Sequence, residues 1–217
     1  MAISIAQAFL NSVRSTLLDP NGQYWTDSEL ISYYNIFVTI AISEYPTLLT
    51  KTVPFALVAG VEQKLPEDGV MFLRAPANVS GEGIIETTAE AMQDADPTWY
   101  KRPPAPIVKH VMPDRNDPLV FRVWPPNDGT GQIYVNYSYA PNDAVLPTDD
   151  FTLTEAYRDA ARNAVLAMAY AKSTDRQDLN KSQYYYALLD KRIQQGMESQ
   201  LRFMSKGGIQ STPKTSE

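Results

Sequence analysis

The strongest constraint on the fold is a change in the spacing of apolar residues along the chain. Both ends repeat apolar residues every three to four positions, which is the period of an amphipathic helix. Between about residue 52 and residue 141 the spacing changes to an alternation of every second residue, which is typical of strands with one dry face. This order predicts two helices, a β-rich insert, two further helices and a tail.

The N-terminal helices are marked by capping residues as well as by apolar stripes. Ser4 is the expected N-cap of the first helix, which ends at "DPNGQ", residues 19–23. Thr26 and Glu29 have the spacing of a capping box for the second helix, and Pro46 ends it. The two stripes consist of Ala6, Phe9, Leu10, Val13 and Leu17, and then of Leu30, Tyr33, Tyr34, Phe37 and Ala41.

Two more helices are predicted in the C-terminal part. Thr152 and Glu155 form a second capping-box pair, and a last long helix is expected from about Leu179 to Ser205. The expected stripes are Tyr157, Ala160, Ala161, Ala164, Val165 and Met168, followed by Tyr185, Leu189, Ile193, Met197 and Leu201. The alanines imply a close approach of neighbouring helices. Because every helix is amphipathic, the two pairs are expected to close on each other as a four-helix bundle. The predicted fold class is therefore α+β, mainly α.

The β-rich insert is expected to contain short strands and one brief helix. Two strands lie around Ala59-Gly60, a third is "GVMFLRAP", and the helix lies near Glu86 to Gln93. The stretch "FRVWPPNDGTGQIYVNYSYAP", residues 121–141, is interpreted as a hairpin around a glycine-bearing turn. Its dry face is formed by Leu119, Phe121, Val123, Ile133, Val135, Tyr137 and Tyr139. Pro125 and Pro126 suit a sheet edge or the end of a strand.

The predicted domain boundaries follow from these elements. Residues 1–50 and 150–205 form the helical bundle, and residues 51–149 form the β-rich insert. Residues 206–217, "KGGIQSTPKTSE", form an extended tail whose single large apolar residue is Ile209. Glycine, serine, threonine and proline predict a flexible segment in isolation.

Composition excludes several classes of function. The chain has no cysteine, which excludes disulfides, thiolate metal sites and cysteine nucleophiles. Its 19 Lys and Arg against 25 Asp and Glu give a net charge of −6, which disfavours binding of duplex DNA through phosphate neutralisation. No apolar run approaches the ~20 residues of a membrane span, and the N-terminus lacks the pattern of a signal peptide. We expect a soluble protein made inside the cell that does not bind membranes.

Candidate catalytic groups are few. Asp149 and Asp150 with Glu155 and Asp159 form the densest carboxylate cluster, and a glycosidase needs two carboxyl groups roughly 5–10 Å apart. Asp149 and Asp150 directly precede a predicted helix, however, where exposed N–H groups favour negative charge. His110 is the only histidine and lies in a strand-like segment, so a triad is conceivable but a His-based zinc site is not. The expectation is no enzyme activity, no cofactor and no metal.

The 13 tyrosines are the most prominent remaining feature. They could form a stacking platform for sugars or bases, but residues 132–141 contain no Lys or Arg, and most of the tyrosines lie at core spacing. Tyr184, Tyr185 and Tyr186 cannot all face one side of a helix, so at least one points away from its own bundle. Because exposed tyrosine is favoured at protein interfaces, these three residues are predicted to form a subunit interface.

In their order along the chain, these elements resemble the phage head-to-tail adaptors, the connector family of short-tailed phages. The resemblance is carried by "YWTDSELISYYNIFVTIAISEYP" (24–46), "LVAGVEQKLP" (57–66), "DADPTWYK" (94–101), "FRVWPP" followed by "VNYSYAP", and "LTEAYRDAARNAVLAMAYAKSTD…NKSQYYYALLDKRI". It covers nearly the whole chain. It implies a ring, commonly of twelve copies, whose body is formed by the helical bundles and which brings no catalytic residues.

The resemblance also implies partners and a location. The partners are further copies of the chain, the portal protein, a tail-tube or nozzle protein, and double-stranded DNA that passes through the lumen during ejection without specific binding. The location is the virion neck, after assembly in the host cytoplasm. The C-terminal segment would grip the portal, with Gly207 and Gly208 as a hinge, Ile209 as an apolar anchor, and Lys206 and Lys214 facing acidic portal surface.

Two alternatives stay open at this point. One is a tail-tube component further from the portal, which keeps the ring but changes its partner. The other is a carbohydrate-binding or wall-degrading virion protein that uses the aromatic residues or the Asp149/Asp150 cluster.

Overall fold

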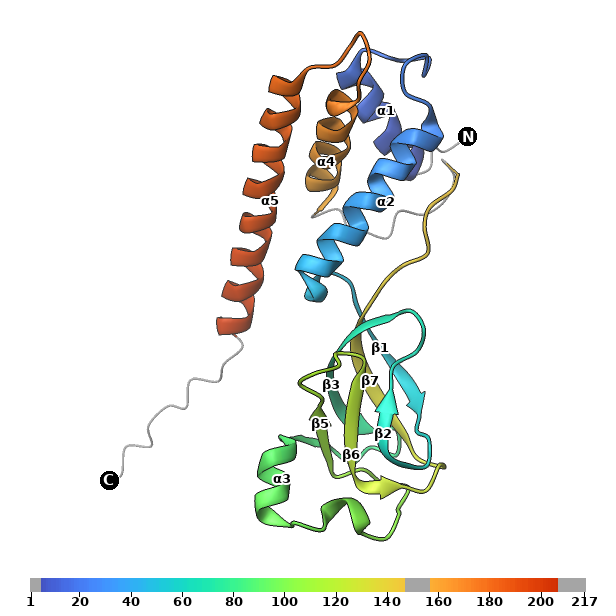
Figure 1. The fold of residues 1–217 in the computed structure, drawn as a ribbon, viewed down its shortest axis with the longest axis vertical. Coiled ribbons are helices and arrows are strands. Elements are labelled where there is room, and N and C mark those ends of the chain that lie inside the picture. The colour runs from blue at the N-terminus through green and yellow to red at the C-terminus, as the bar shows by residue number, and fades with distance from the viewer. Residues whose placement is uncertain (1–4, 147–156, 207–217) are drawn as a thin grey trace, which may run out of the picture. The chain divides into compact units, whose positions relative to one another are not determined.

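The computed structural model describes residues 5–146 and 157–206, with side chains described up to Gly196 (Figure 1). The chain divides into two compact units. The first, called the helical unit here, consists of residues 1–38 and 143–217, and the second, the β unit, consists of residues 39–142.

The helical unit contains four helices. They are α1 (Ile5–Leu17), α2 (Asp27–Glu44, whose last residues belong to the β unit), α4 (Arg158–Ala171) and α5 (Leu179–Lys206). Helix α4 lies between α5 on one side and α1 and α2 on the other (Figure 1). The predicted close approach at α4 is confirmed, since Ala160, Ala161, Ala164, Ala167 and Ala169 are all buried.

The turn between α1 and α2 is organised by the buried carboxylate of Asp19. It accepts hydrogen bonds from the backbone N–H groups of Gln23, Tyr24 and Trp25 at 2.8, 3.0 and 3.0 Å. Burial alone would raise the pKa of Asp19, but these three donors and a nearby arginine outweigh it and lower that pKa below its ordinary value. The Trp25 indole donates to the carbonyl of Ala169 at 3.1 Å, which ties the turn to α4.

Arg14 completes this turn. Its Nε and Nη2 atoms lie 3.0 and 2.5 Å from Oδ1 of Asp27, and its Nη1 donates to the backbone carbonyl of Asp19 at 3.2 Å. Gly22 lies against the Arg14 guanidinium and has a φ of +67°. An added Cβ would lie 2.9 Å from both Nη atoms. Glycine is therefore required at position 22 both by the backbone conformation and by the space.

The β unit is a sandwich of two sheets. Its strands are β1 (Thr50–Ala56), β2 (Gly60–Lys64), β3 (Gly69–Asn78), β4 (Ile85–Glu86), β5 (His110–Pro113), β6 (Val120–Asn127) and β7 (Gln132–Tyr139). One sheet has the order β1-β7-β3 and the other β2-β6-β5-β4. The two inner faces share one core, in which Phe72 of β3 stacks on Phe121 of β6 with ring centroids 4.5 Å apart. Helix α3 (Ala89–Ala95) and Trp99 pack on Met112 of the second sheet.

The predicted hairpin at residues 121–141 is wrong. Strands β6 and β7 belong to different sheets, because β6 pairs with β2 and β5 while β7 pairs with β1 and β3. The inward residues of this stretch were nevertheless predicted correctly, and Phe121, Val123, Ile133, Val135 and Tyr137 are all in the shared core. Alternation shows which residues face a core, but two strands that face each other across a sandwich have the same alternation as two strands of a hairpin.

The chain crosses between the sheets through an arch held by Asn127. Its amide donates to the carbonyls of Ala105 and Pro106 at 3.1 and 3.2 Å and accepts from the N–H groups of Gly129 and Gly131 at 2.8 and 3.2 Å. An added Cβ on Gly131 would lie 2.3 Å from both the Asn127 amide nitrogen and the Pro106 carbonyl. The arch therefore depends on one buried amide and on the missing side chain beside it.

The predicted fold class, a mainly α four-helix bundle, is also wrong. Within the described residues the chain has five α-helices and two sheets of seven strands, with about 42% helix and 25% strand. The β part is no minor insert, because its two sheets enclose their own core. Helix α5 packs along α4, but within residues 183–196 only Leu189 is buried. A helical period shows that one face is buried, but not how many helices cover it.

Smaller differences concern single elements. The helix predicted near Glu86 to Gln93 begins later, at Ala89, because Thr88 is its N-cap and accepts the N–H of Ala91 at 3.1 Å. The capping box of α2 is half confirmed, since Thr26 accepts the N–H of Glu29 at 3.2 Å. The predicted roles of Ser4, Thr152 and Glu155 lie outside the described residues.

Candidate interaction surfaces

The three consecutive tyrosines of α5 take different positions. Tyr185 faces α4 and stacks on Tyr170, with ring centroids 5.8 Å apart and an interplanar angle of 2°. Tyr184 and Tyr186 are 59% and 43% exposed. Since successive helical residues are about 100° apart, the exposed pair lies on opposite flanks of α5. The sequence required one outward tyrosine and the structure has two, while their role in a subunit interface stays a prediction.

Helix α2 has a feature that the sequence interpretation missed. It contains no charged residue between Glu29 and Glu44, although part of its surface is exposed. Ile36 and Ile40 are 45% and 50% exposed, and the remaining exposed residues of this stretch are Ser32, Thr39 and Ser43. An exposed apolar face without charges is a mark of an interaction surface. In the sequence, this surface could have been predicted from the fourteen consecutive uncharged residues 30–43.

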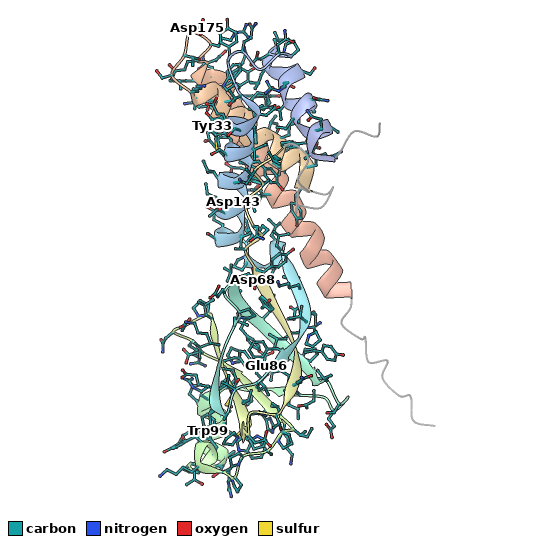
Figure 2. The ribbon with its side chains drawn as sticks, turned by 90° about the vertical axis from the view of Figure 1, so that its right-hand side faces the viewer. Tyr33, Asp68, Glu86, Trp99, Asp143 and Asp175 are labelled. Atoms are coloured by element: carbon teal, nitrogen blue, oxygen red, sulfur yellow. The ribbon has the colours of Figure 1, made fainter. Side chains whose placement is uncertain are left out.

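Tyr33 and Glu29 lie at one end of this face (Tyr33 is labelled in Figure 2). The Tyr33 hydroxyl donates to Oε1 of Glu29 at 2.9 Å, and Lys172 at the end of α4 lies 2.8 Å from Oε2. Burial, with the adjacent carboxylate, raises the pKa of Tyr33 to about 12. The phenol therefore stays protonated at neutral pH and keeps Glu29 fixed in place.

The predicted portal-binding residues are beyond what the structure describes. Lys206 is the last residue of α5, and its side chain is not described. Gly207, Gly208, Ile209 and Lys214 lie outside the described residues. Their role stays a proposal.

The candidate catalytic residues are not brought together by the described structure. Asp149, Asp150 and Glu155 lie outside the described residues, and Asp159 is exposed and pairs with Arg192 at 3.3 Å. His110 lies on β5, as predicted for a strand, with its ring 5.4 Å from that of Trp124. The described residues contain no group of three histidine, aspartate or glutamate side chains that could hold a metal ion.

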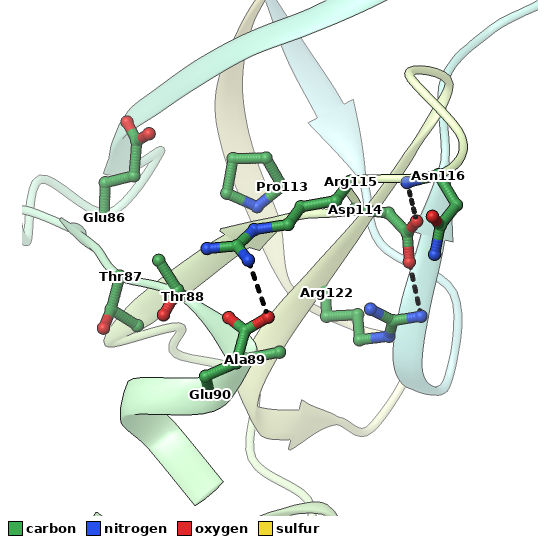
Figure 3. Close-up of a pocket in the computed structure, with 10 residues that line it drawn as sticks. All are labelled: Glu86, Thr87, Thr88, Ala89, Glu90, Pro113, Asp114, Arg115, Asn116 and Arg122. Atoms are coloured by element: carbon green, nitrogen blue, oxygen red, sulfur yellow. Dashed lines mark hydrogen bonds and ion pairs between the residues drawn. The ribbon is translucent and has the colours of Figure 1, made fainter. Parts of the chain in front are cut away.

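A pocket of about 520 Å³ lies in the β unit, between the start of α3 and the loop that joins β5 to β6 (Figure 3). Arg115 pairs with Glu90 at 3.1 Å, and Arg122 pairs with Asp114 at 2.5 Å. Hydrogen bonds from backbone N–H groups of the loop, together with Arg122, hold the pKa of Asp114 below its ordinary value. Both guanidinium groups are thus already neutralised by carboxylates that fix the loop and the helix, which is a structural role.

A second polar cluster lies where β1, β3 and β7 meet (Asp68 is labelled in Figure 2). The Lys51 ammonium pairs with Asp68, lies 5.2 and 4.7 Å from the ring centroids of Tyr137 and Tyr139, and so joins three strands. The hydrogen bond from Lys51 lowers the pKa of Asp68, and the same bond raises the pKa of Lys51.

The described helices include none that is long and apolar enough to cross a bilayer. The exposed features gathered on α2 and α5 are those of a protein that binds other proteins.

Comparison with protein families agrees with this class. The sequence model of the family described as SU10 adaptor protein matches residues 5–209, and the chain belongs to this family. The resemblance to phage head-to-tail adaptors is therefore confirmed, and the protein is a phage adaptor, a structural component of the virion. A comparison with curated proteins found no match.

Proposed function

We propose that this adaptor forms a ring, of twelve copies, that joins the portal to the tail in the virion neck and lets the genome pass. The observation that carries the proposal is the family match over residues 5–209, nearly the whole chain. The exposed faces of α2 and α5 support it, because a subunit that stays single would leave an uncharged helix face and two tyrosines in water.

The C-terminal residues 206–217 are proposed to attach the ring to the portal. Gly207 and Gly208 release the segment from α5, Ile209 anchors it, and Lys206 and Lys214 face acidic portal surface. An extended segment of twelve residues reaches about 40 Å, which is enough to pass from one subunit to another.

Passage of DNA requires a lumen that does not hold it. The net charge of −6 supports a lumen dominated by carboxylates, since basic walls would bind phosphates in a salt-dependent way. The tail-tube or nozzle protein then binds the opposite end of the ring.

The direct test is assembly with the portal of the same phage. Mass photometry of the chain mixed with portal rings should show a defined complex, and electron microscopy should show a ring of this chain on one end of the portal. The chain without residues 206–217 should fold but fail to attach. A chain that stays monomeric beside the portal would refute the proposal, and portal binding by the shortened chain would refute the role of the tail.

A further inference from the structure

We propose that residues 100–106, "YKRPPAP", form a docking segment for a second virion protein, one whose surface presents neighbouring tryptophan or tyrosine rings beside a carboxylate. These residues are called the proline segment here. The segment lies in the β unit, directly after Trp99 (labelled in Figure 2). The inference rests on the proposed function only in taking the partner from the virion, and it adds a surface that the proposed ring does not assign.

The sequence of the proline segment favours a polyproline II helix, an extended helix with about three residues per turn. Proline holds its own φ at about −65°, and the residue before a proline is kept out of the α-helical region. Each of the residues 102–105 is a proline, precedes one, or both. Arg102 has a φ of −63° and a ψ of 152°, which are polyproline II values. The segment therefore already has the conformation that proline-recognising surfaces bind.

Both ends of the proline segment are fixed by hydrogen bonds. At its start, Nε of Arg102 donates to Oδ2 of Asp96 at 2.6 Å. At its end, the N–H of Ala105 donates to the Pro126 carbonyl at 2.9 Å, and the Asn127 amide of the arch donates to the Ala105 carbonyl at 3.1 Å. A segment that is held in this way loses little conformational entropy when it binds a partner.

Between these ends the backbone presents hydrogen-bond acceptors and no donors. Pro103 and Pro104 are exposed and have no N–H group. Within the described parts of the chain, the carbonyl oxygens of residues 102–104 accept no hydrogen bond. A row of acceptors cannot extend a β-sheet, and it does not suit phosphate groups, which are acceptors themselves. It suits a surface that donates from tryptophan indole or tyrosine hydroxyl groups.

The side chains of the segment form an apolar contact face. Tyr100 is 51% exposed, and its ring packs on the buried Trp99 ring, with centroids 5.8 Å apart and an interplanar angle of 88°. Pro103 and Pro106 are exposed and lie three residues apart, which places them on the same side of a polyproline II helix. Aromatic rings of a partner can pack on such a face, because proline-rich segments dock in aromatic-lined grooves.

The charges around the segment favour a protein over a nucleic acid. The ammonium of Lys101 lies 5.9 Å from the Tyr100 ring centroid, and Lys101 is exposed without an ion-pair partner among the residues that the structure describes. Arg102 is neutralised by Asp96. Over residues 89–109, three acidic residues balance three basic ones: Glu90, Asp94 and Asp96 against Lys101, Arg102 and Lys109. A region without net positive charge is unsuited to phosphate binding, whereas Lys101 matches one carboxylate on a protein.

The partner is a protein other than a second copy of this chain, because the described residues offer no suitable aromatic surface. Their exposed aromatic residues are Tyr100, Tyr134, Tyr184 and Tyr186. No two of these four rings are in contact, and Tyr184 instead contacts Tyr185, which stacks on Tyr170. A groove for a polyproline II helix needs rings that lie side by side.

Site-directed crosslinking in the virion tests the proposal. Tyr100 is replaced by the photoreactive residue p-benzoylphenylalanine, and purified virions are irradiated. The expected product joins this chain to one other virion protein, at a site where tryptophan or tyrosine lies beside an aspartate or glutamate. The same replacement at Tyr134, an exposed tyrosine of the β unit outside the segment, should not give this product.

Three results would overturn the docking segment: a crosslink to a second copy or to DNA, a crosslinked site without aromatic residues, or no product from virions that contain the chain. Because such virions have incorporated the chain, these results would leave the proposed ring intact. Absence of the chain from the neck would instead contradict the proposed function.

A pair of variants tests the role of the backbone. A chain with both Pro103→Ala and Pro104→Ala loses the fixed polyproline II conformation but keeps Tyr100 and Lys101. It should bind the purified partner at least tenfold more weakly, while Pro76→Ala, at an exposed proline of β3, should bind like the unaltered chain. Both variants should keep the circular dichroism spectrum of the unaltered chain, which shows that they fold. Equal binding by the two variants would contradict the inference.

Discussion

The helical unit and the β unit differ in what holds them together and in what they leave exposed. The β unit satisfies its loops internally with buried amides, such as Asn127 in the arch and Asn78, which exchanges two hydrogen bonds with Val108 at 2.8 and 2.9 Å. The helical unit is held mainly by close packing of small apolar residues on α4, and it leaves uncharged helix surface in water. A unit of the first kind is complete by itself, whereas a unit of the second kind is suited to assembly.

The largest effect is expected from Gly131→Ala in the β unit. The new Cβ would displace the Asn127 amide and leave buried donors and acceptors unpaired, at a cost of at least about 3 kcal/mol. Chemical denaturation should show the loss, and hydrogen exchange should place it in residues 39–142 and not in α1 or α4. Gly83→Ala is the matched control, because nothing lies within 4 Å of its added Cβ. Equal stability of the two variants would mean that the amide does not hold the arch.

The helical unit should instead be destabilised by a larger side chain in its core. Ala164→Leu adds three carbons to a fully buried position on α4 and should cost about 2 kcal/mol by overpacking. The thermal midpoint followed by helical circular dichroism measures this change. Ala187→Leu on the exposed side of α5 should be close to neutral, and a similar loss for both would argue against close packing at α4.

The regions around Gly131 and Ala164 show how much of the fold could be predicted from the sequence. The apolar period located the inward residues of both units, including Phe121, Ile133 and the alanines of α4, because burial leaves a periodic trace. The partners of each strand and helix were not readable, since a hairpin and a sandwich crossing share the same alternation. The exposed tyrosines of α5 were predictable from helical geometry alone. The uncharged face of α2 was predictable from the absence of charged residues between Glu29 and Glu44, but the apolar residues of this helix were interpreted only as core.

A smaller effect is expected at the turn between α1 and α2. Because the folded pKa of Asp19 is lowered, its carboxylate contributes stability that is present above the unfolded value and is lost as the pH falls through the folded value. Asp19→Asn should cost about 1–2 kcal/mol at neutral pH, since three N–H donors lose a charged acceptor. Denaturation between pH 7 and pH 2 should show a flatter pH dependence for the variant. Asp94→Asn on α3 serves as the control, and an unchanged pH dependence in Asp19→Asn would contradict the account.

The smallest effect is expected at the Lys51–Asp68 pair, because both side chains are about one-third exposed and water screens their attraction. Lys51→Met should cost no more than about 1 kcal/mol. The lowered pKa of Asp68 makes the contribution disappear in acid, as the pH falls through that pKa, and the raised pKa of Lys51 makes it disappear in alkali, as the pH rises through that one. A loss in Lys51→Met that does not depend on pH would assign the effect to tyrosine packing instead.

The pairing of β1 with β7 has a consequence for how such a protein can change over time. The first strand of the β unit begins at Thr50 and its last strand ends at Tyr139. These two points are neighbours, since Thr50 pairs with Ser138 and the N–H of Tyr139 donates to the Leu49 carbonyl at 3.1 Å. A segment whose two ends meet can be lengthened, shortened or exchanged by recombination without altering the path of the flanking chain. The β unit can therefore be altered or replaced as one cassette without moving the ends of the flanking helical segments.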